Sequence, residues 1–378
     1  MPYSRDSIIE ALENVAQIGV PSVGAASVLD VGTQDFIRFF EREILDNFIA
    51  QGGSTCRFFE GAYGSGKTHL LQLLHDVAIK RKMLVVEVEL SHSMNFVNWH
   101  SITQFILEKI QCRFDGKIIQ SVPKILDALA AQHWAIQKPL KSFHLPHTGF
   151  VNGIETYLKM NRNLSPAAKD KLSQFLLGQR VSAVELRKLG VTGVKNPLSR
   201  RNAELVLNTV LSALYHIGFP GTLLLFDETD QTFRNTLTHS LKARSAANIM
   251  RRLIDACSLS GIKGVLVSFA VLPNFIPACA NNYQAVGERL MISSAGRLEP
   301  GWRTPVLRLD AINTLPEHAE FVDSAIEKFL ILSRTLGIDT NLRSQLQQAG
   351  VDILNKHAGL DFRRPLIRRF ASMLLAHV

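Results

Sequence analysis

The sequence contains few cysteines. Four cysteines occur among 378 residues, far apart and without a Cys-x-x-Cys pair. This spacing is typical of reduced thiols, so it predicts neither a disulfide framework nor a cysteine metal site and favours a cytoplasmic protein. Histidines form no metal-binding pattern either, because no carboxylate or cysteine set accompanies His133, His144 and His147. These three histidines are predicted to be structural or solvent-facing.

Long apolar runs are also lacking. Residues 1–15 carry acidic side chains and no sustained apolar stretch, which argues against a signal peptide. The longest uncharged stretch, residues 264–287, contains prolines and asparagines. It fits a buried strand followed by a loop better than a membrane span, so no membrane partner is expected.

Charge is only moderately unbalanced. Lys and Arg number 42 and Asp and Glu number 33, which gives a net charge of +9. An excess of cations favours a polyanionic partner, because neutralising phosphates releases counterions. The excess is modest for this length, and a cationic patch beside a bound nucleotide would account for much of it. Net charge alone therefore leaves nucleic-acid binding open.

Residues 61–68 read Gly-Ala-Tyr-Gly-Ser-Gly-Lys-Thr and match the phosphate-binding P-loop pattern. A short stretch rich in aromatic residues at 56–60 predicts a strand before this turn, and residues 68–82 have one apolar helical face after it. Glycines let backbone N–H groups converge on phosphate oxygens at a helix N-terminus. Lys67 is expected to reach the β- and γ-phosphates of ATP, and the Thr68 hydroxyl to bind Mg²⁺. The predicted nucleotide-binding residues here are Gly61, Ala62, Tyr63, Gly64, Ser65, Gly66, Lys67, Thr68 and His69.

A second motif lies at 221–228, where four consecutive apolar residues precede two carboxylates. A continuously apolar strand is typical of the centre of a parallel sheet, and ligands bind at the carboxyl ends of such strands. We therefore interpret Asp227 as the residue that holds Mg²⁺ through a water molecule and Glu228 as the residue that polarises the attacking water. An ordinary strand end followed by an exposed acidic turn is the alternative.

Further candidates follow on the next strand, residues 265–271. Ser268 is the candidate sensor of the γ-phosphate, with Asn274 as its competitor and a buried structural serine as the plain alternative. Arg289 is the candidate for an arginine that points at a neighbouring subunit's nucleotide, followed by Arg297 and Arg303. Each of these arginines could equally form a surface salt bridge.

Two helices are expected before the P-loop strand. The first spans 6–18 and stops at Gly19 and Pro21. The second begins near Thr33 and runs to about residue 50. Both helices could cover an adenine base or serve as plain packing. The expected apolar face of the second helix comprises Phe36, Phe40, Ile44 and Phe48.

These patterns predict an α/β fold, with a parallel sheet of the P-loop NTPase (AAA+/ASCE-like) type. The expected organisation is an N-terminal helical segment (1–53), a core (54–312) and a C-terminal helical lid (313–378). Within the core, residues of about 115–205 read as a helical insertion with scattered His, Pro and Gly. The lid is expected to contain helices at about 316–337, 340–358 and 361–377.

In this order, the motifs resemble AAA+ ATPases and, more closely, the ATP-binding proteins of bacterial BREX-type phage-defence systems. The resemblance rests on EALENVAQIGVPS, FFEGAYGSGKTHLLQLL, FLLGQRVSAVELRKLGV with GFPGTLLLFDE, and the closing RRPLIRRF. The last piece is similar to a sensor-2 helix with Arg364 at the arginine position, although Pro365 follows it.

The resemblance implies an ATPase that uses ATP and Mg²⁺ and works with other proteins of a multi-protein defence system. It leaves open whether the protein binds DNA directly or forms a homo-oligomer. Two other interpretations remain at this stage: a DNA-binding ATP switch of the origin-recognition or helicase-loader type, and a nucleotide-dependent scaffold that does not hydrolyse ATP.

Overall fold

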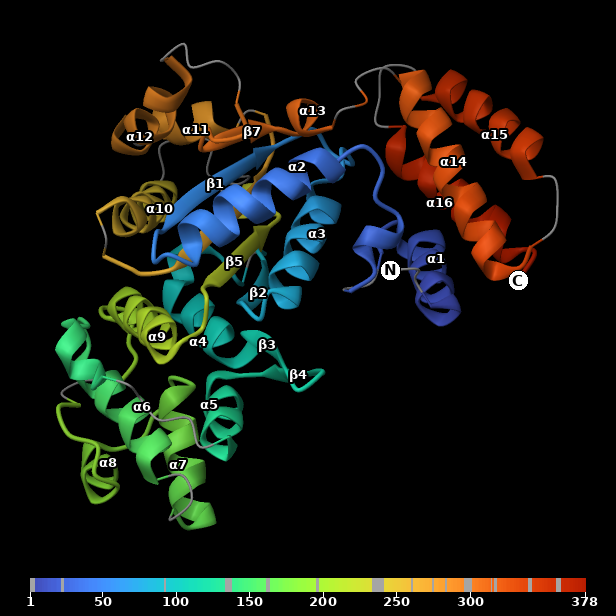
Figure 1. Ribbon diagram of the computed structural model, residues 1–378. Coiled ribbons are helices and arrows are strands. Elements are labelled where there is room, and N and C mark those ends of the chain that lie inside the picture. Colours follow the sequence, from blue (N-terminus) through green and yellow to red (C-terminus); the bar gives the residue numbers. More distant parts are fainter. Residues whose placement is uncertain are drawn as a thin grey trace.

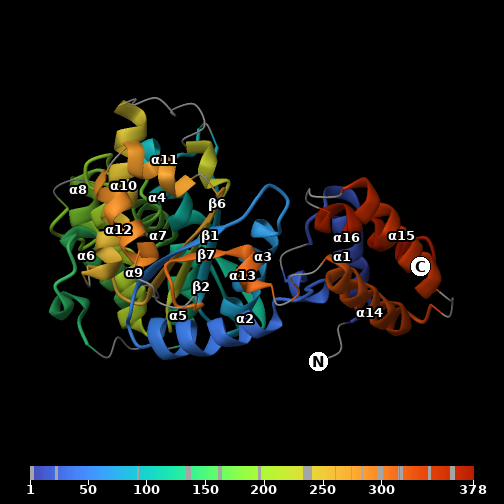
Figure 2. The ribbon, with the colours of Figure 1, turned by 90° about the horizontal axis from the view of Figure 1, so that it is seen from above.

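The computed structural model describes most of the chain. The described residues are 4–21, 24–91, 93–132, 138–160, 164–194, 197–232, 241–259, 261–273, 275–282, 284–295, 301–313, 315, 318–338, 342–357 and 362–378. Within them, one sheet and its covering helices form a mixed α/β core, and a separate group of helices lies beside it (Figures 1 and 2).

The sheet has seven strands in the order β4-β3-β2-β5-β6-β1-β7. Strands β2, β5, β6, β1 and β7 are parallel to one another, whereas β3 pairs antiparallel with both β2 and β4 at one edge. The central strands β5 and β6 are buried along almost their whole length, as expected for parallel strands covered on both faces. The strands are β1 (Thr55–Glu60), β2 (Leu84–Glu89), β3 (Gln111–Phe114), β4 (Lys117–Gln120), β5 (Thr222–Asp227), β6 (Val265–Val271) and β7 (Val306–Arg308).

Helices cover both faces of the sheet. One face packs against α3 (Lys67–Lys80), α2 (Gln34–Phe39) and the π-helix η2 (Phe40–Ile49). The other packs against α4 (Trp99–Lys109), α9 (Ala203–Ile217) and α10 (Leu241–Ser258). The remaining short elements of the core are η3 (Phe96–Asn98), η5 (Thr229–Thr232), α11 (Phe275–Asn282), α12 (Gln284–Ala295) and α13 (Leu309–Ile312).

Three details of the core differ from the sequence predictions. Helix α4 ends at Lys109, and the β3–β4 hairpin occupies the start of the section expected to be helical from residue 115. The stretch after β6, expected as a loop, forms α11 and α12. Phe48, expected on a buried face, is 43% exposed, because the wider π winding places residues five apart on the same face and buries Leu45 and Ile49 instead.

The insertion (residues 115–205) begins within the β3–β4 hairpin, and the part beyond β4 extends away from the sheet (Figure 1). Its apolar side chains, including Tyr157, Leu172 and Phe175, belong to the same buried cluster as the helices on that face of the sheet. The insertion is therefore an outgrowth of the core rather than an independently packed unit. Its elements are α5 (Val122–Ala131), η4 (Leu140–Phe143), α6 (Thr148–Met160), α7 (Pro166–Leu176) and α8 (Ala183–Lys188).

The helical lid consists of α14 (His318–Leu336), α15 (Leu342–Lys356) and α16 (Arg363–Leu375). It has its own apolar cluster, which also includes α1 (Arg5–Ile18) and part of η1 (Ala26–Val28). The two ends of the chain therefore lie in the same helical group (Figure 2). The N-terminal segment 1–53 does not pack as one unit, because α1 joins the lid whereas α2 and η2 join the sheet.

Candidate nucleotide site

The loop of residues 61–66, here called the glycine loop, connects the end of β1 to the start of α3. Gly64 has φ +78° and Gly66 has φ +98°, in the left-handed region that residues with a Cβ rarely adopt. Gly66 is the N-cap of α3, so the unpaired N–H groups of the first helical turn open toward the loop. This arrangement suits an anion at the helix N-terminus.

Lys67, the first residue of α3, folds back over the glycine loop. Its Nζ donates hydrogen bonds to the carbonyl oxygens of Gly61 at 2.8 Å and Ala62 at 2.9 Å. Ser65 Oγ donates to the same Ala62 oxygen at 2.8 Å. The ammonium group is thus held at the mouth of the loop, within reach of any anion that the loop receives.

The acidic end of β5 lies directly against the glycine-loop helix. Thr68 Oγ1 donates a 2.6 Å hydrogen bond to Asp227 Oδ2, although 159 residues separate the two in sequence. The other carboxylate oxygen of Asp227 accepts the backbone N–H of Glu228 at 2.8 Å. A hydroxyl and a carboxylate, both ligands that Mg²⁺ prefers, therefore converge at one point.

Glu228 follows β5 in an unusual backbone conformation. Its φ of +51° is left-handed, which costs a residue with a Cβ roughly 1–2 kcal/mol. Such strain persists only where the surroundings enforce it, and it is often found at functional sites. Here it accompanies a carboxylate that lines the same cavity as the glycine loop.

Asp230 is a residue that the sequence analysis did not single out. Its Oδ1 accepts the backbone N–H of Leu272 at 3.0 Å, which joins the carboxyl ends of β5 and β6. Burial raises the pKa of Asp230, while the positive charge of Lys67 opposes that rise. The one sequence signal that pointed to Asp230 as a site residue was its position two residues after the acidic pair, which is weak evidence without the fold.

A cavity connects the glycine loop to the lid. It encloses about 1150 Å³, including the part that is open to solvent. Its polar half is lined by residues 63–69 with Asp227 and Glu228. The opposite half is mainly apolar and comes from the chain after α1 and from the lid. Six residues of the apolar half are Val20, Pro21, Leu29, Val31, Phe321 and Ile367.

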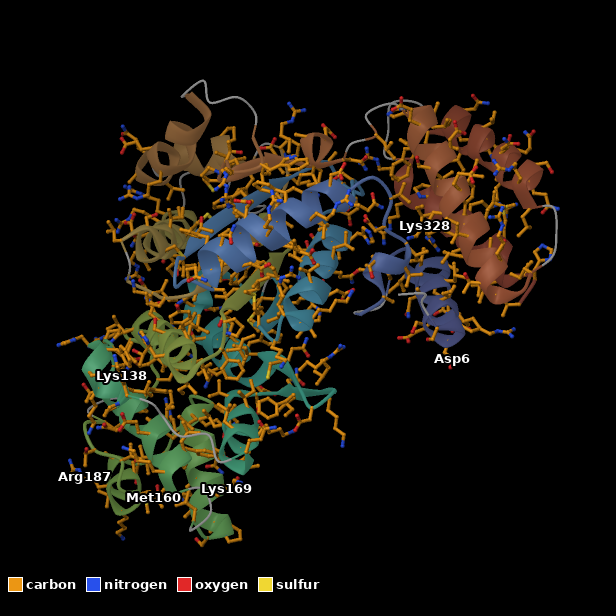
Figure 3. All side chains as sticks on the ribbon, in the orientation of Figure 1. Asp6, Lys138, Met160, Lys169, Arg187 and Lys328 are labelled. Atoms are coloured by element: carbon orange, nitrogen blue, oxygen red, sulfur yellow. The ribbon has the colours of Figure 1, made fainter. Side chains whose placement is uncertain are left out.

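The segment between α1 and α2 (residues 19–21 and 24–33 of the described chain), here called the connector, is fastened to both core and lid. On α3, the buried Asp76 carboxylate accepts the N–H groups of Gly24 at 2.7 Å and Ala26 at 3.2 Å. On α14, Lys328 Nζ donates to the carbonyl of Ser27 at 3.4 Å, and burial lowers the pKa of this lysine. Figure 3 shows Lys328 on the side of the lid that faces the core. The connector is thus a fixed wall of the cavity.

Two arginines of α16 line the cavity from the lid side. The guanidinium of Arg364 donates to the carbonyl of Ile18, the last residue of α1, at 2.6 Å. Arg363 lies over the ring of Phe321 at 4.9 Å from its centroid. The lid therefore presents positive charge toward the same space that the glycine loop and the acidic pair border.

A comparison with protein families matches residues 2–322 to the BREX system ATP-binding protein BrxC/D family. The match covers most of the chain, including the glycine loop and the acidic pair. The chain belongs to this family. Searches of curated proteins and of solved structures returned no match. The family match ends inside α14, so α15 and α16, with Arg363 and Arg364, lie beyond it.

The family assignment agrees with the resemblance found in the sequence, and most of the predicted site residues lie around the cavity. Residues 63–69, Asp227, Glu228 and Arg364 all line it, as a common nucleotide site requires. His69 also faces it, with Nε2 3.9 Å from Asp30 Oδ1 on the connector. Gly61 and Ala62 begin the loop and hold Lys67 through their carbonyls.

The structure does not bring Ser268 to the cavity. Ser268 lies in the middle of β6 opposite Arg57 of β1, fully buried, and its Oγ has no hydrogen-bond partner. Burial lowers the pKa of Arg57 to about 10, and its guanidinium donates to the carbonyls of Arg303 and Thr304. The sensor interpretation of Ser268 therefore has no geometric support, because the strand continues for three residues before it reaches the site edge. Asn274, its competitor, lies outside the described residues.

Arg289 is also placed away from the cavity. It lies on α12 and forms an ion pair with Asp255 of α10. Arg303 pairs with Glu43 of η2, and Arg297 lies outside the described residues. In this chain Arg289 joins two helices on one face of the core. Its role at the nucleotide of a neighbouring subunit stays a prediction, because that role concerns a second copy of the chain.

The donor set at Thr68 and Asp227 fits Mg²⁺. Magnesium usually takes one or two protein oxygens and completes its shell with phosphate and water. No cluster of three or more His, Cys, Asp or Glu suited to a metal occurs among the described residues, so a site built wholly from protein ligands is not indicated there. In the same part of the chain, no helix is long and apolar enough to cross a membrane.

Proposed function

We propose that the protein is an AAA+-like P-loop ATPase that binds Mg²⁺·ATP between the glycine loop and the acidic end of β5. The observation that carries this proposal is the 2.6 Å contact between Thr68 and Asp227, which joins two distant motifs at one point. Family membership supports ATP as the nucleotide. The phosphates would lie on the polar half of the cavity and the base on its apolar half.

The strand order supports the same class of ATPase. Strand β6 lies between β1, which leads into the glycine loop, and β5, which ends in the acidic pair. An added strand at this position is the feature that defines the ASCE type of P-loop fold.

The residues divide the chemistry as follows. Lys67 would replace its hydrogen bonds to the carbonyls of Gly61 and Ala62 by hydrogen bonds to phosphate oxygens. The N–H groups at the start of α3 would donate to the β-phosphate. Thr68 and Asp227 would hold Mg²⁺, whose charge offsets that of the phosphate oxygens. Glu228 would orient a water molecule and accept its proton as it attacks the γ-phosphate.

The position of the lid would depend on whether the bound nucleotide carries a γ-phosphate. Arg364 lines the cavity and is bound to the carboxyl end of α1, so contact with phosphate would change the position of both α16 and α1. A conformational change of this kind needs a ligand that interacts differently with the two states, and the γ-phosphate supplies that difference. We propose that the resulting movement acts on other proteins of the BREX system.

Substitution of Glu228 tests the catalytic assignment. We expect Glu228→Gln to bind ATP with wild-type affinity but to hydrolyse it about 10²–10⁴ times more slowly, because the general base is lost. Glu89→Gln is the matched control, since Glu89 ends β2 in register with Asp227 but does not line the cavity. Turnover by Glu228→Gln at the wild-type rate would contradict the assignment. Binding without turnover in the wild type, even with other BREX proteins present, would favour a scaffold that does not hydrolyse ATP.

A further inference from the structure

The positive charge of the protein is concentrated in one part of the chain. Residues 115–205 contain fourteen Lys and Arg against six Asp and Glu, a net charge of +8 out of +9 for the whole protein. The other 287 residues, with the glycine loop and the lid, are therefore close to neutral. A bound nucleotide cannot account for this excess, because residues 115–205 do not line its cavity.

Most cations of the insertion are exposed and lack an acidic partner. Within the described part of residues 115–205, nine Lys and Arg side chains are exposed and have no carboxylate within salt-bridge distance. These unpaired cations are Lys117, Lys124, Lys138, Lys141, Arg180, Arg187, Lys188, Arg200 and Arg201.

Four of the six acidic residues of the insertion form ion pairs and the other two accept hydrogen bonds, so none of them is paired with the nine exposed cations. Three of these acids form ion pairs with lysines of the insertion that are not among the nine unpaired cations. Glu204 forms an ion pair with Arg252 of α10. Asp115 and Asp170 accept hydrogen bonds from glutamine side chains. The three pairs within the insertion are Lys159–Glu155, Lys169–Asp127 and Lys171–Glu185.

The unpaired cations come from several elements of the insertion. Lys138 precedes η4 and Lys141 lies within it. Arg187 and Lys188 are the last two residues of α8, and Arg200 precedes α9. Figure 3 shows Lys138 and Arg187 along the outer side of the insertion, remote from Lys328 at the lid. The charge is thus spread over an extended surface rather than gathered in a pocket.

The surface lacks the features of a protein-binding site. Protein interfaces usually have an apolar core enriched in aromatic residues. Among the described residues of the insertion, the exposed large apolar side chains belong to different elements and include no aromatic residue. Stacking platforms for single-stranded nucleic acid also require aromatic residues. The exposed large apolar residues in the described part of this region are Ile118, Met160, Val184 and Leu205.

We propose that the insertion binds the phosphate backbone of duplex DNA through these unpaired cations, without reading the base sequence. Each cation that neutralises a phosphate releases condensed counterions, and this release supplies the affinity. An extended array of lysines and arginines fits the regular charge of a duplex, whereas base recognition would need donors and acceptors placed in a groove. The ATP site and the DNA surface thus occupy different parts of one core.

Fluorescence anisotropy with a labelled 30-base-pair duplex, without nucleotide, tests this proposal. If six cations contact phosphates, affinity should fall roughly 10³-fold between 50 and 200 mM salt. The test variant is the pair Arg187→Gln and Lys188→Gln, and the matched control is Lys356→Gln and Arg369→Gln, which removes the same charge from exposed positions of the lid. We expect the test variant to bind DNA about tenfold more weakly. Its slope of log binding constant against log salt concentration should be smaller in magnitude by about two, and the control should show neither change.

Three results would overturn the proposal: no binding at 50 mM salt, equal losses in the test and control variants, or displacement of the duplex by polyglutamate at equal charge. The last result would indicate an acidic protein as the partner. Lys67→Ala separates this question from the ATPase proposal, because it should retain DNA binding even if it loses ATP. A melting-temperature measurement on each variant excludes loss of the fold as the cause.

Discussion

Cations near the nucleotide cavity and cations of the insertion differ in their surroundings. Around the cavity, Lys67 and Arg364 donate to backbone carbonyls, and Lys328 is partly buried against the connector. On the insertion, Lys138 and Arg187 are exposed and have no acidic partner among the described residues. The first set is positioned by the fold before any ligand arrives, as a site for one small anion requires. The second set is free to follow a large polyanion.

The comparison predicts that charges engaged by the fold affect stability more than charges that are exposed and unpaired.

Asp76→Asn should have the largest effect. Its carboxylate accepts two backbone N–H groups of the connector in a buried place, and an amide can accept only one of them. The loss should be about 2 kcal/mol, seen as a drop of several degrees in melting temperature. Asp46→Asn is the control, because Asp46 pairs with Arg81 at the surface and should matter less. Equal drops for the two variants would show that the connector is not held through Asp76.

Arg364→Ala and Arg368→Ala should differ in nucleotide binding but not in stability. Both arginines donate to carbonyls at the end of α1, Arg364 to Ile18 and Arg368 to Ala16 and Gln17. Each loss should lower the free energy of unfolding by about 1 kcal/mol. Of these two arginines, Arg364 lines the cavity and Arg368 does not. Arg364→Ala should therefore weaken ATP binding by about tenfold, whereas Arg368→Ala should not. Unchanged affinity in a calorimetric titration would remove Arg364 from the phosphate site.

Glu87→Gln should stabilise the protein. Glu87 Oε1 is buried without a hydrogen-bond partner, and burial raises the pKa of this carboxyl above 4.5. His75 opposes this rise, whereas Asp76 and Asp227 add to it. The folded state then holds its proton more tightly than the unfolded state, so stability falls as the pH rises above about 4.5. At pH 7 the glutamine should raise the melting temperature by an amount equivalent to about 1 kcal/mol. The gain should vanish near pH 4.5, and a gain independent of pH would refute the buried-charge explanation.

Lys138→Gln with Lys141→Gln should have the smallest effect on stability. Both side chains are exposed and unpaired among the described residues, so the free energy of unfolding should change by less than about 0.5 kcal/mol. A chemical denaturation curve measures this change. A loss as large as that of Arg368→Ala would show that these lysines hold the fold and would weaken the contrast with the cavity.

Local patterns in the sequence were sufficient to predict much of the core. The glycine turn between a strand and a helix depends on residues close together in the chain, and so does the apolar run that ends at Asp227. Their meeting through Thr68 was expected from the pairing of the motifs. The three helices of the lid were also expected, because their apolar periodicity is strong.

Features that depend on distant contacts were harder to predict. Nothing in residues 5–18 indicates that α1 packs on α16 rather than on the sheet, and the connector residues that wall the cavity carry no motif. The β3–β4 hairpin was missed because its two strands are four residues long and follow a helix directly. Ser268 was predicted to contact the γ-phosphate because it lies on the strand after the acidic pair. Its register with Arg57 shows that it lies in the middle of β6, away from the carboxyl end of the strand.

The binding of Mg²⁺·ATP to wild-type protein and to Lys67→Ala, measured by isothermal titration calorimetry, tests the nucleotide site most directly. Lys80→Ala at the other end of α3 serves as the control, since it removes a lysine that is exposed and remote from the glycine loop. We predict that Lys67→Ala binds at least about 100-fold more weakly than the wild type, because charge-assisted hydrogen bonds to phosphate are lost, and that Lys80→Ala binds normally. Equal affinity for all three proteins would contradict the placement of ATP on the glycine loop.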